Sequence, residues 1–146
     1  MVQQPDSRSE LNNLASENAI SSVTKIMQYN NSHLNVNEII PVWFSWLPAW
    51  EDESELPYIY NFLFMLIENK HPAILGENNS NLLRLLYIFS EVLCRNSVEL
   101  TSEIGVKIGL FLNELKNDMN LLRQCLEELN REHPNHVQQL RQILNV

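Results

Sequence analysis

Apolar side chains recur at three- and four-residue steps along almost the whole chain, and in places they cover several sides of the predicted helix. The clearest case is 57–69, where Ile59, Phe62 and Leu66 share one face while Phe64 lies on another. A helix that is apolar on several sides must be covered by more than one neighbour. Because the 23 leucines far outnumber the valines and threonines that sheets favour, the sequence predicts an all-α fold without strands.

The periodic segments predict about seven helices, separated by polar or proline-containing stretches. Their expected ranges are 11–29, 37–47, 57–69, 80–96, 101–116, 118–130 and 134–145. The buried face predicted for the first helix is Leu11, Leu14, Ala15, Ala19, Val23, Ile26 and Met27. The last helix is predicted to start at Pro134 and to bury Val137, Leu140 and Leu144. Residues 1–10 have too few apolar side chains to be buried, which predicts a disordered lead-in.

The short connections predict that consecutive helices pair, giving the units 11–47, 57–96 and 101–130. These pairs begin about 45 residues apart, as in HEAT and armadillo repeats. A closed bundle needs one apolar stripe per helix, whereas stacked pairs need apolar surface on several sides. The pattern therefore favours an α-solenoid over 11–146, with 134–145 as the helix that caps its end.

Four segments carry a resemblance to a known family. They are ENAISSVTKIMQYN (17–30), VNEIIPVWFSWLPAWEDESE (36–55), IENKHPAILGENNSNL (67–82) and LEELNREHPNHVQQLRQIL (126–144). In order and in content they resemble the C-terminal HEAT repeats of the importin beta-3 group of karyopherins. Members of that group are around a thousand residues long, so the likeness is to their last few repeats.

The resemblance implies Ran-dependent protein import through nuclear pores, with shuttling between cytoplasm and nucleus. In that family Ran is bound chiefly by the N-terminal repeats, and the second helix of each pair lines the surface that receives cargo. The corresponding helices here are 37–47, 80–96 and 118–130. Basic cargo proteins and Phe-Gly nucleoporins are the partners that the resemblance implies.

The candidate partner-binding residues lie between the second and third predicted helices. They are Trp50, Glu51, Asp52, Glu53 and Glu55. The acidic residues are complementary to a Lys/Arg-rich import signal, although a solvated helix N-terminus also accounts for them. Trp43 and Trp46 are interpreted as core, and the alternative is an exposed aromatic hollow for a peptide or a Phe-Gly segment. Trp50, which lies outside the helix, is the best candidate for exposure.

Several function classes are disfavoured. The net charge of −8 argues against non-specific nucleic-acid binding, and the ten-residue apolar run 58–67 is too short to span a membrane. Cys125, His133 and His136 have near metal-ligand spacing, but Cys125 lacks a second cysteine close by, so no metal or other cofactor is expected. The glycines of the Gly105-x-x-x-Gly109 motif are interpreted as close helix packing. Because no catalytic motif is present, the chain is not expected to be an enzyme.

Two rival functions remain open. One is a stand-alone helical adaptor unrelated to transport, and the more remote one is a small metal-dependent helical enzyme. The solenoid prediction has a further consequence for the first helix. If it is the exposed end of a stack, its apolar outer face should make the chain self-associate.

Overall fold

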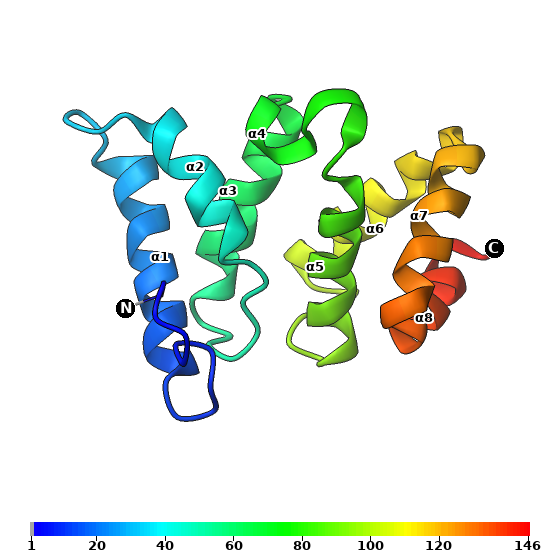
Figure 1. Cartoon of the computed structure of the whole chain (residues 1–146), viewed down its shortest axis with the longest axis horizontal. Helices are drawn as coiled ribbons and strands as arrows, with labels where there is room; N and C mark the ends of the chain where they lie inside the picture. The colour runs from blue at the N-terminus through cyan, green and yellow to red at the C-terminus, as the bar shows by residue number, and fades with distance from the viewer. Residues whose placement is uncertain (1) are drawn as a thin grey trace. The chain divides into compact units, whose positions relative to one another are not determined.

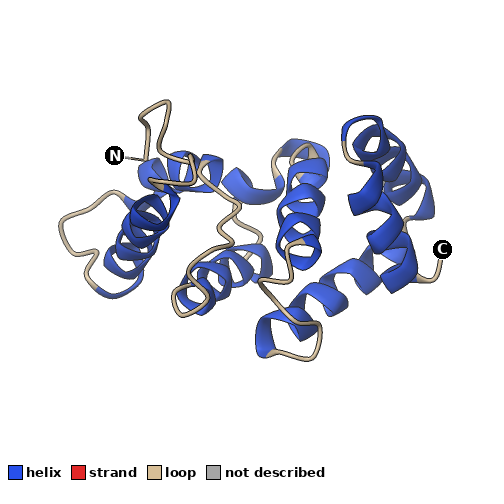
Figure 2. Cartoon of the chain, turned by 90° about the horizontal axis from the view of Figure 1, so that it is seen from below, coloured by secondary structure: helices blue, strands red, loops and turns tan. Residues whose placement is uncertain are grey.

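The computed structural model describes residues 2–146, and all regular structure in that range is helical (Figure 1). The α-helices are α1 (Asn13–Tyr29), α2 (Val36–Ser45), α3 (Leu56–Glu68), α4 (Pro72–Leu75), α5 (Leu82–Cys94), α6 (Glu103–Glu114), α7 (Met119–Glu132) and α8 (Pro134–Leu144). Two short 3₁₀ helices are η1 (Glu77–Asn79) and η2 (Leu115–Asn117). Helices and loops account for the whole described range, without strands (Figure 2). The predicted all-α fold of packed helices, consistent with an α-solenoid, is confirmed.

The seven predicted helices all occur, with ends within two residues of the expected positions. The exception is the one-turn helix α4, which lies in a stretch predicted as a loop. Pro72 has the backbone angle that a first helical residue needs, and Gly76, with φ of 73°, ends the turn in a conformation that glycine adopts readily.

The helices form two compact units, the first ending at Ile74 and the second beginning at Leu75. This boundary falls inside the pair 57–96 that the spacing predicts, and the helix pairs and the single region 11–146 stay predictions. No helix within residues 2–146 combines the length and apolar character needed to cross a membrane.

In the first unit, α1 packs on α3 and, over a smaller area, on α2. Trp43 of α2 is fully buried and joins the three helices. Its ring meets that of Phe62 on α3 edge-on, with 5.2 Å between centroids, and its Nε1 donates to Thr24 Oγ1 on α1 at 2.8 Å. Trp43 is therefore core, as predicted, whereas Trp46 is half-buried.

The buried face of α1 differs from the predicted one. It consists of Asn13, Ser16, Glu17, Ile20, Ser21, Thr24 and Met27. Of the predicted residues only Met27 is buried, while Leu11, Leu14 and Ile26 are 90%, 47% and 44% exposed. The prediction was wrong because most of these buried polar groups have hydrogen-bond partners, although Asn13 Oδ1 has none. Ser16 Oγ, for example, donates to the Ser7 carbonyl at 2.6 Å.

The described part of the lead-in, residues 2–10, lies against the start of α1. It forms successive turns, and Ser7 is only 5% exposed. Ser7 Oγ donates to the carbonyl of Val2 at 2.7 Å. Met1 lies outside the described residues. The polar groups of this segment form hydrogen bonds with one another and with α1.

In the second unit, α5, α7 and α8 pack on one another, and α6 contacts α8. Phe89 of α5 is fully buried and meets Phe111 of α6 edge-on, with 5.3 Å between centroids. On α8, Val137, Leu140 and Leu144 are buried as the periodicity predicts. The exposed residues of α8 include the polar Gln138, Arg141 and Gln142.

The two glycines of α6 have different surroundings. A Cβ at Gly105 would lie 1.9 Å from the carbonyl oxygen of Glu99, so only glycine allows α6 to approach the preceding loop. At Gly109 a Cβ would meet no atom within 4 Å. The interpretation of this motif as close packing therefore holds for Gly105 but not for Gly109.

Candidate functional site

The predicted partner-binding residues lie in one loop, residues 50–55, which we call the acidic loop. It connects α2 to α3 and is fastened to α1 by the carboxylate of Glu17. The backbone N–H groups of Trp50, Glu51 and Asp52 donate to that carboxylate at 2.6, 2.8 and 2.9 Å. Because Glu17 is completely buried, these bonds are shielded from water and hold the loop in one conformation.

The acidic side chains of the loop differ in how accessible they are to a binding partner. Glu51 and Glu53 are exposed, and Asp52 and Glu55 are half-buried. Glu51 accepts a hydrogen bond from Asn13 Nδ2 at 2.7 Å, and Asp52 accepts one from Ser54 at 2.6 Å. The loop therefore presents the exposed residues Glu51 and Glu53, with Glu51 bonded to Asn13 and with Asp52 beside them.

Glu55 already has a cation from this chain. Lys25 Nζ lies 2.7 Å from its carboxylate, and Ser21 Oγ also donates to it. The hydrogen bond from Lys25, followed by that from Ser21, lowers the pKa of Glu55, and the same bond raises the pKa of Lys25. Glu55 thus links the loop to α1 and is less available to a partner than Glu51 or Glu53.

Trp50 is half-buried, whereas the sequence predicts the most exposed of the three tryptophans. The guanidinium carbon of Arg8 lies 4.5 Å from the centre of its ring. Arg8 Nη2 also approaches Glu17 Oε1 at 3.5 Å and donates to the carbonyl of Pro48. The lead-in therefore reaches the acidic loop through a single arginine.

Sequence reasoning missed Glu17 and Arg8. A signal for Glu17 was present, because it is the only charged residue between Glu10 and Lys25 and lies on a helix that is otherwise neutral there. For Arg8 no local signal exists, since its partners are about ten and forty residues away along the chain.

A second polar cluster ties α8 to α5 in the second unit. His136 Nε2 and Arg95 Nε each donate to the carboxylate of Glu91, which is 8% exposed. Burial by itself raises the pKa of Glu91, but the bonds from His136 and Arg95 outweigh it and lower the pKa. The Tyr87 ring stacks on His136, with 5.8 Å between centroids, and lies tilted against His133, with 4.7 Å between centroids.

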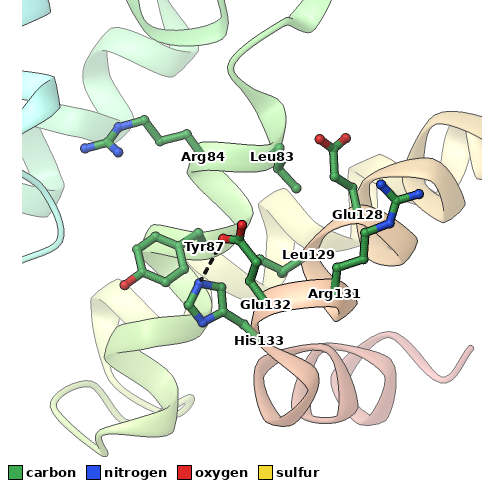
Figure 3. A pocket seen from close by; sticks show the side chains of 8 residues that line it. All are labelled: Leu83, Arg84, Tyr87, Glu128, Leu129, Arg131, Glu132 and His133. Carbon is green, nitrogen blue, oxygen red and sulfur yellow. Dashed lines mark ion pairs between the residues drawn. The ribbon is translucent and has the colours of Figure 1, made fainter.

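A cavity of about 540 Å³ lies beside this cluster (Figure 3). Its lining residues are Leu83, Arg84, Tyr87, Glu128, Leu129, Arg131, Glu132 and His133. Two arginines and two glutamates line it, so its charge favours neither an anion nor a cation. Figure 3 shows Glu132 and His133 side by side, with 3.9 Å between Oε2 and Nε2, next to the Tyr87 ring.

The residues considered for a metal site have other surroundings. Cys125 is buried on α7, His136 is bonded to Glu91, and His133 lies against the Tyr87 ring. Within the range 2–146, no three His, Cys, Asp or Glu side chains are grouped as metal ligands.

Comparison with known proteins identifies two yeast relatives. Over 80 residues the chain is 35% identical to importin subunit beta-3 of Saccharomyces cerevisiae, a match that covers 54% of this chain and 7% of that protein. Over 112 residues it is 25% identical to the probable importin subunit beta-4 of Schizosaccharomyces pombe, covering 77% of this chain and 10% of that protein. The chain is related to importin beta subunits. No protein-family model matches it.

The relationship confirms the resemblance predicted from the four segments. It connects the chain with importin beta subunits and not with an enzyme family. The chain spans no more than a tenth of the length of either relative.

Proposed function

We propose that this chain is a non-catalytic, HEAT-type protein-binding segment of an importin-beta-like nuclear transport receptor that acts in Ran-dependent protein import and shuttles between cytoplasm and nucleus. The observation that carries the proposal is its similarity to two importin beta subunits, together with its all-helical fold. In this proposal Ran is bound by repeats outside the chain, and α8 caps the end of the helical stack.

The proposed cargo site is the acidic loop. Glu51 and Glu53, with Asp52 beside them, present carboxylates on a backbone that Glu17 holds in place. A site that is ordered before binding loses less entropy when a partner docks. The net charge of −8 also attracts a Lys/Arg-rich segment from a distance. Phe-Gly nucleoporins are proposed as further partners, with the exposed edge of Trp50 as their anchor.

The test is the affinity of the chain for a fluorescent Lys/Arg-rich peptide, measured at two salt concentrations. Replacing Glu51 and Glu53 by Gln is expected to weaken binding about fivefold at low salt and less at high salt. The matched control replaces Glu99 and Glu114, two exposed glutamates of the second unit, so that the net charge changes equally. Equal weakening by both pairs would show that the acidic loop is not the site.

A separate experiment tests the place of the chain in transport. The chain, and any longer native form, are used to capture proteins with and without Ran loaded with GTP. The proposal expects basic cargo on both forms and release by Ran·GTP from the longer form. A stand-alone adaptor predicts no cargo that responds to Ran.

A further inference from the structure

The contact between Arg8 and the acidic loop has the composition of an arginine-binding site. The Arg8 guanidinium lies over the Trp50 ring at 4.5 Å, approaches Glu17 Oε1 at 3.5 Å and donates to the Pro48 carbonyl. An aromatic face, a carboxylate and a carbonyl oxygen are the three kinds of group that recognise a planar cation with several N–H donors. A lysine ammonium does not stack and donate in this way, so the site prefers arginine.

The site is built by residues that are held independently of Arg8. Glu17 is completely buried, and its carboxylate also accepts the N–H groups of Trp50, Glu51 and Asp52. A buried carboxylate is destabilising unless a positive charge or hydrogen bonds compensate it, so a cation beside Glu17 stabilises the fold. If Arg8 moves away, the loop keeps its conformation, and the buried carboxylate of Glu17 loses a cation that stabilises its charge.

Arg8 itself lies on a segment of turns that precedes the first helix. Residues 2–10 form turns and no helix, and Arg8 retains 27% of its side-chain exposure. The segment is held to α1 by isolated bonds, such as that from Ser16 to the Ser7 carbonyl and those from Asn12 to Asp6. Leu11, which joins it to α1, is 90% exposed. Local opening is least costly where few apolar contacts must break.

We propose that Trp50, Glu17 and Pro48 form an arginine-binding site that Arg8 occupies within the chain and that an arginine of a basic partner takes over when the lead-in is released. The free-energy change of this exchange is small, because one guanidinium replaces another on the same three groups. The lead-in then acts as an internal competitor that weakens binding of arginine-containing segments. The identity of the partner rests on the proposed function, but the site does not.

Chemical rescue tests the site without any partner. In the full chain, Arg8→Ala is expected to lower the Tm by about 5 °C, and millimolar methylguanidinium is expected to restore most of that loss. Methylammonium at the same concentration is the control for charge alone and should restore much less. Adding Trp50→Leu to Arg8→Ala should abolish the rescue. The proposal is overturned if the two cations raise the Tm equally, or if methylguanidinium leaves the Tm of the variant unchanged.

Competition tests the exchange. Arg8→Ala is expected to bind an arginine-containing peptide about tenfold more tightly than the unaltered chain, with little change for a peptide in which lysine replaces arginine. The matched control is Arg131→Ala, which removes an exposed arginine of the second unit. If Arg131→Ala strengthens binding as much, the effect is one of net charge and the competitor role is refuted. Failure of the Glu51 and Glu53 variants, by contrast, rejects only the proposed cargo loop and leaves the rescue result unaffected.

Discussion

The first and last helices of the chain use opposite chemistry on their buried faces. On α8 the buried residues are Val137, Leu140 and Leu144, and its outer side is polar. On α1 the buried face includes Ser16, Glu17 and Thr24, while Leu14, Ile26 and Tyr29 are 47%, 44% and 70% exposed. A helix can therefore bury a face in two ways. On α8 the buried side chains pack as apolar groups, and on α1 many of them are polar and form hydrogen bonds that replace those with water.

This difference also affects which surfaces can pack against the outer face of each helix. A polar outer face, as on α8, is adapted to solvent and suits the proposed cap of a stack. An apolar outer face, as on α1, remains attractive to another protein surface.

The largest effect is expected at Glu17. Glu17→Gln keeps the size of the side chain but places an amide among three N–H donors that require an acceptor, so unfolding should become easier by about 3 kcal/mol. The shape-conserving change on α8, Leu140→Met, should decrease stability by less than about 1.5 kcal/mol. Denaturant titration of both variants measures the difference. Similar losses would mean that Glu17 acts by packing alone.

A smaller, pH-dependent effect is expected for the cluster that ties α8 to α5. The pKa of Glu91 in the folded chain is lower than its ordinary value of 4.5, so the unfolded chain takes up this proton first as the pH falls. The stabilisation is therefore complete above pH 4.5 and is lost as the pH falls through the folded pKa. Glu91→Gln should decrease stability by about 1 kcal/mol at pH 7 and make it less sensitive to acid.

Thermal unfolding between pH 7 and pH 3 checks this expectation. The control is Glu103→Gln, which removes an exposed ion pair with Lys107 at 3.8 Å and should change stability by less than about 0.5 kcal/mol. A Glu91→Gln profile with the same acid sensitivity as the unaltered chain would contradict the assignment.

The smallest effect on stability, with a distinct effect on association, is expected on the outer face of α1. Ile26→Glu should change the free energy of unfolding by no more than about 0.5 kcal/mol, because the side chain is already 44% exposed. It should nevertheless reduce the self-association predicted for the chain. Sedimentation over a range of concentrations measures it, with Gln138→Glu on the outer face of α8 as control. A strictly monomeric unaltered chain would refute the prediction.

Local sequence properties were sufficient to predict the helices. Apolar periodicity, with stop signals such as Pro48 and start signals such as Pro134, predicted the ends of seven helices to within two residues. These signals are local because they act through neighbouring residues. The buried face of α8 followed for the same reason, since its apolar and polar sides are cleanly separated. The acidic loop was also identified as a candidate site from its composition alone.

Long-range packing, in contrast, determines which side of α1 faces inward and how the acidic loop is held. Ser16, Glu17 and Thr24 are buried because their partners, Ser7, the loop at 50–52 and Trp43, come from other parts of the chain. A periodicity argument assigns every polar side chain to solvent, since the sequence does not state where its hydrogen-bond partner will lie. Arg8 reached Trp50 for the same reason, as the approach of distant groups depends on packing and not on local spacing.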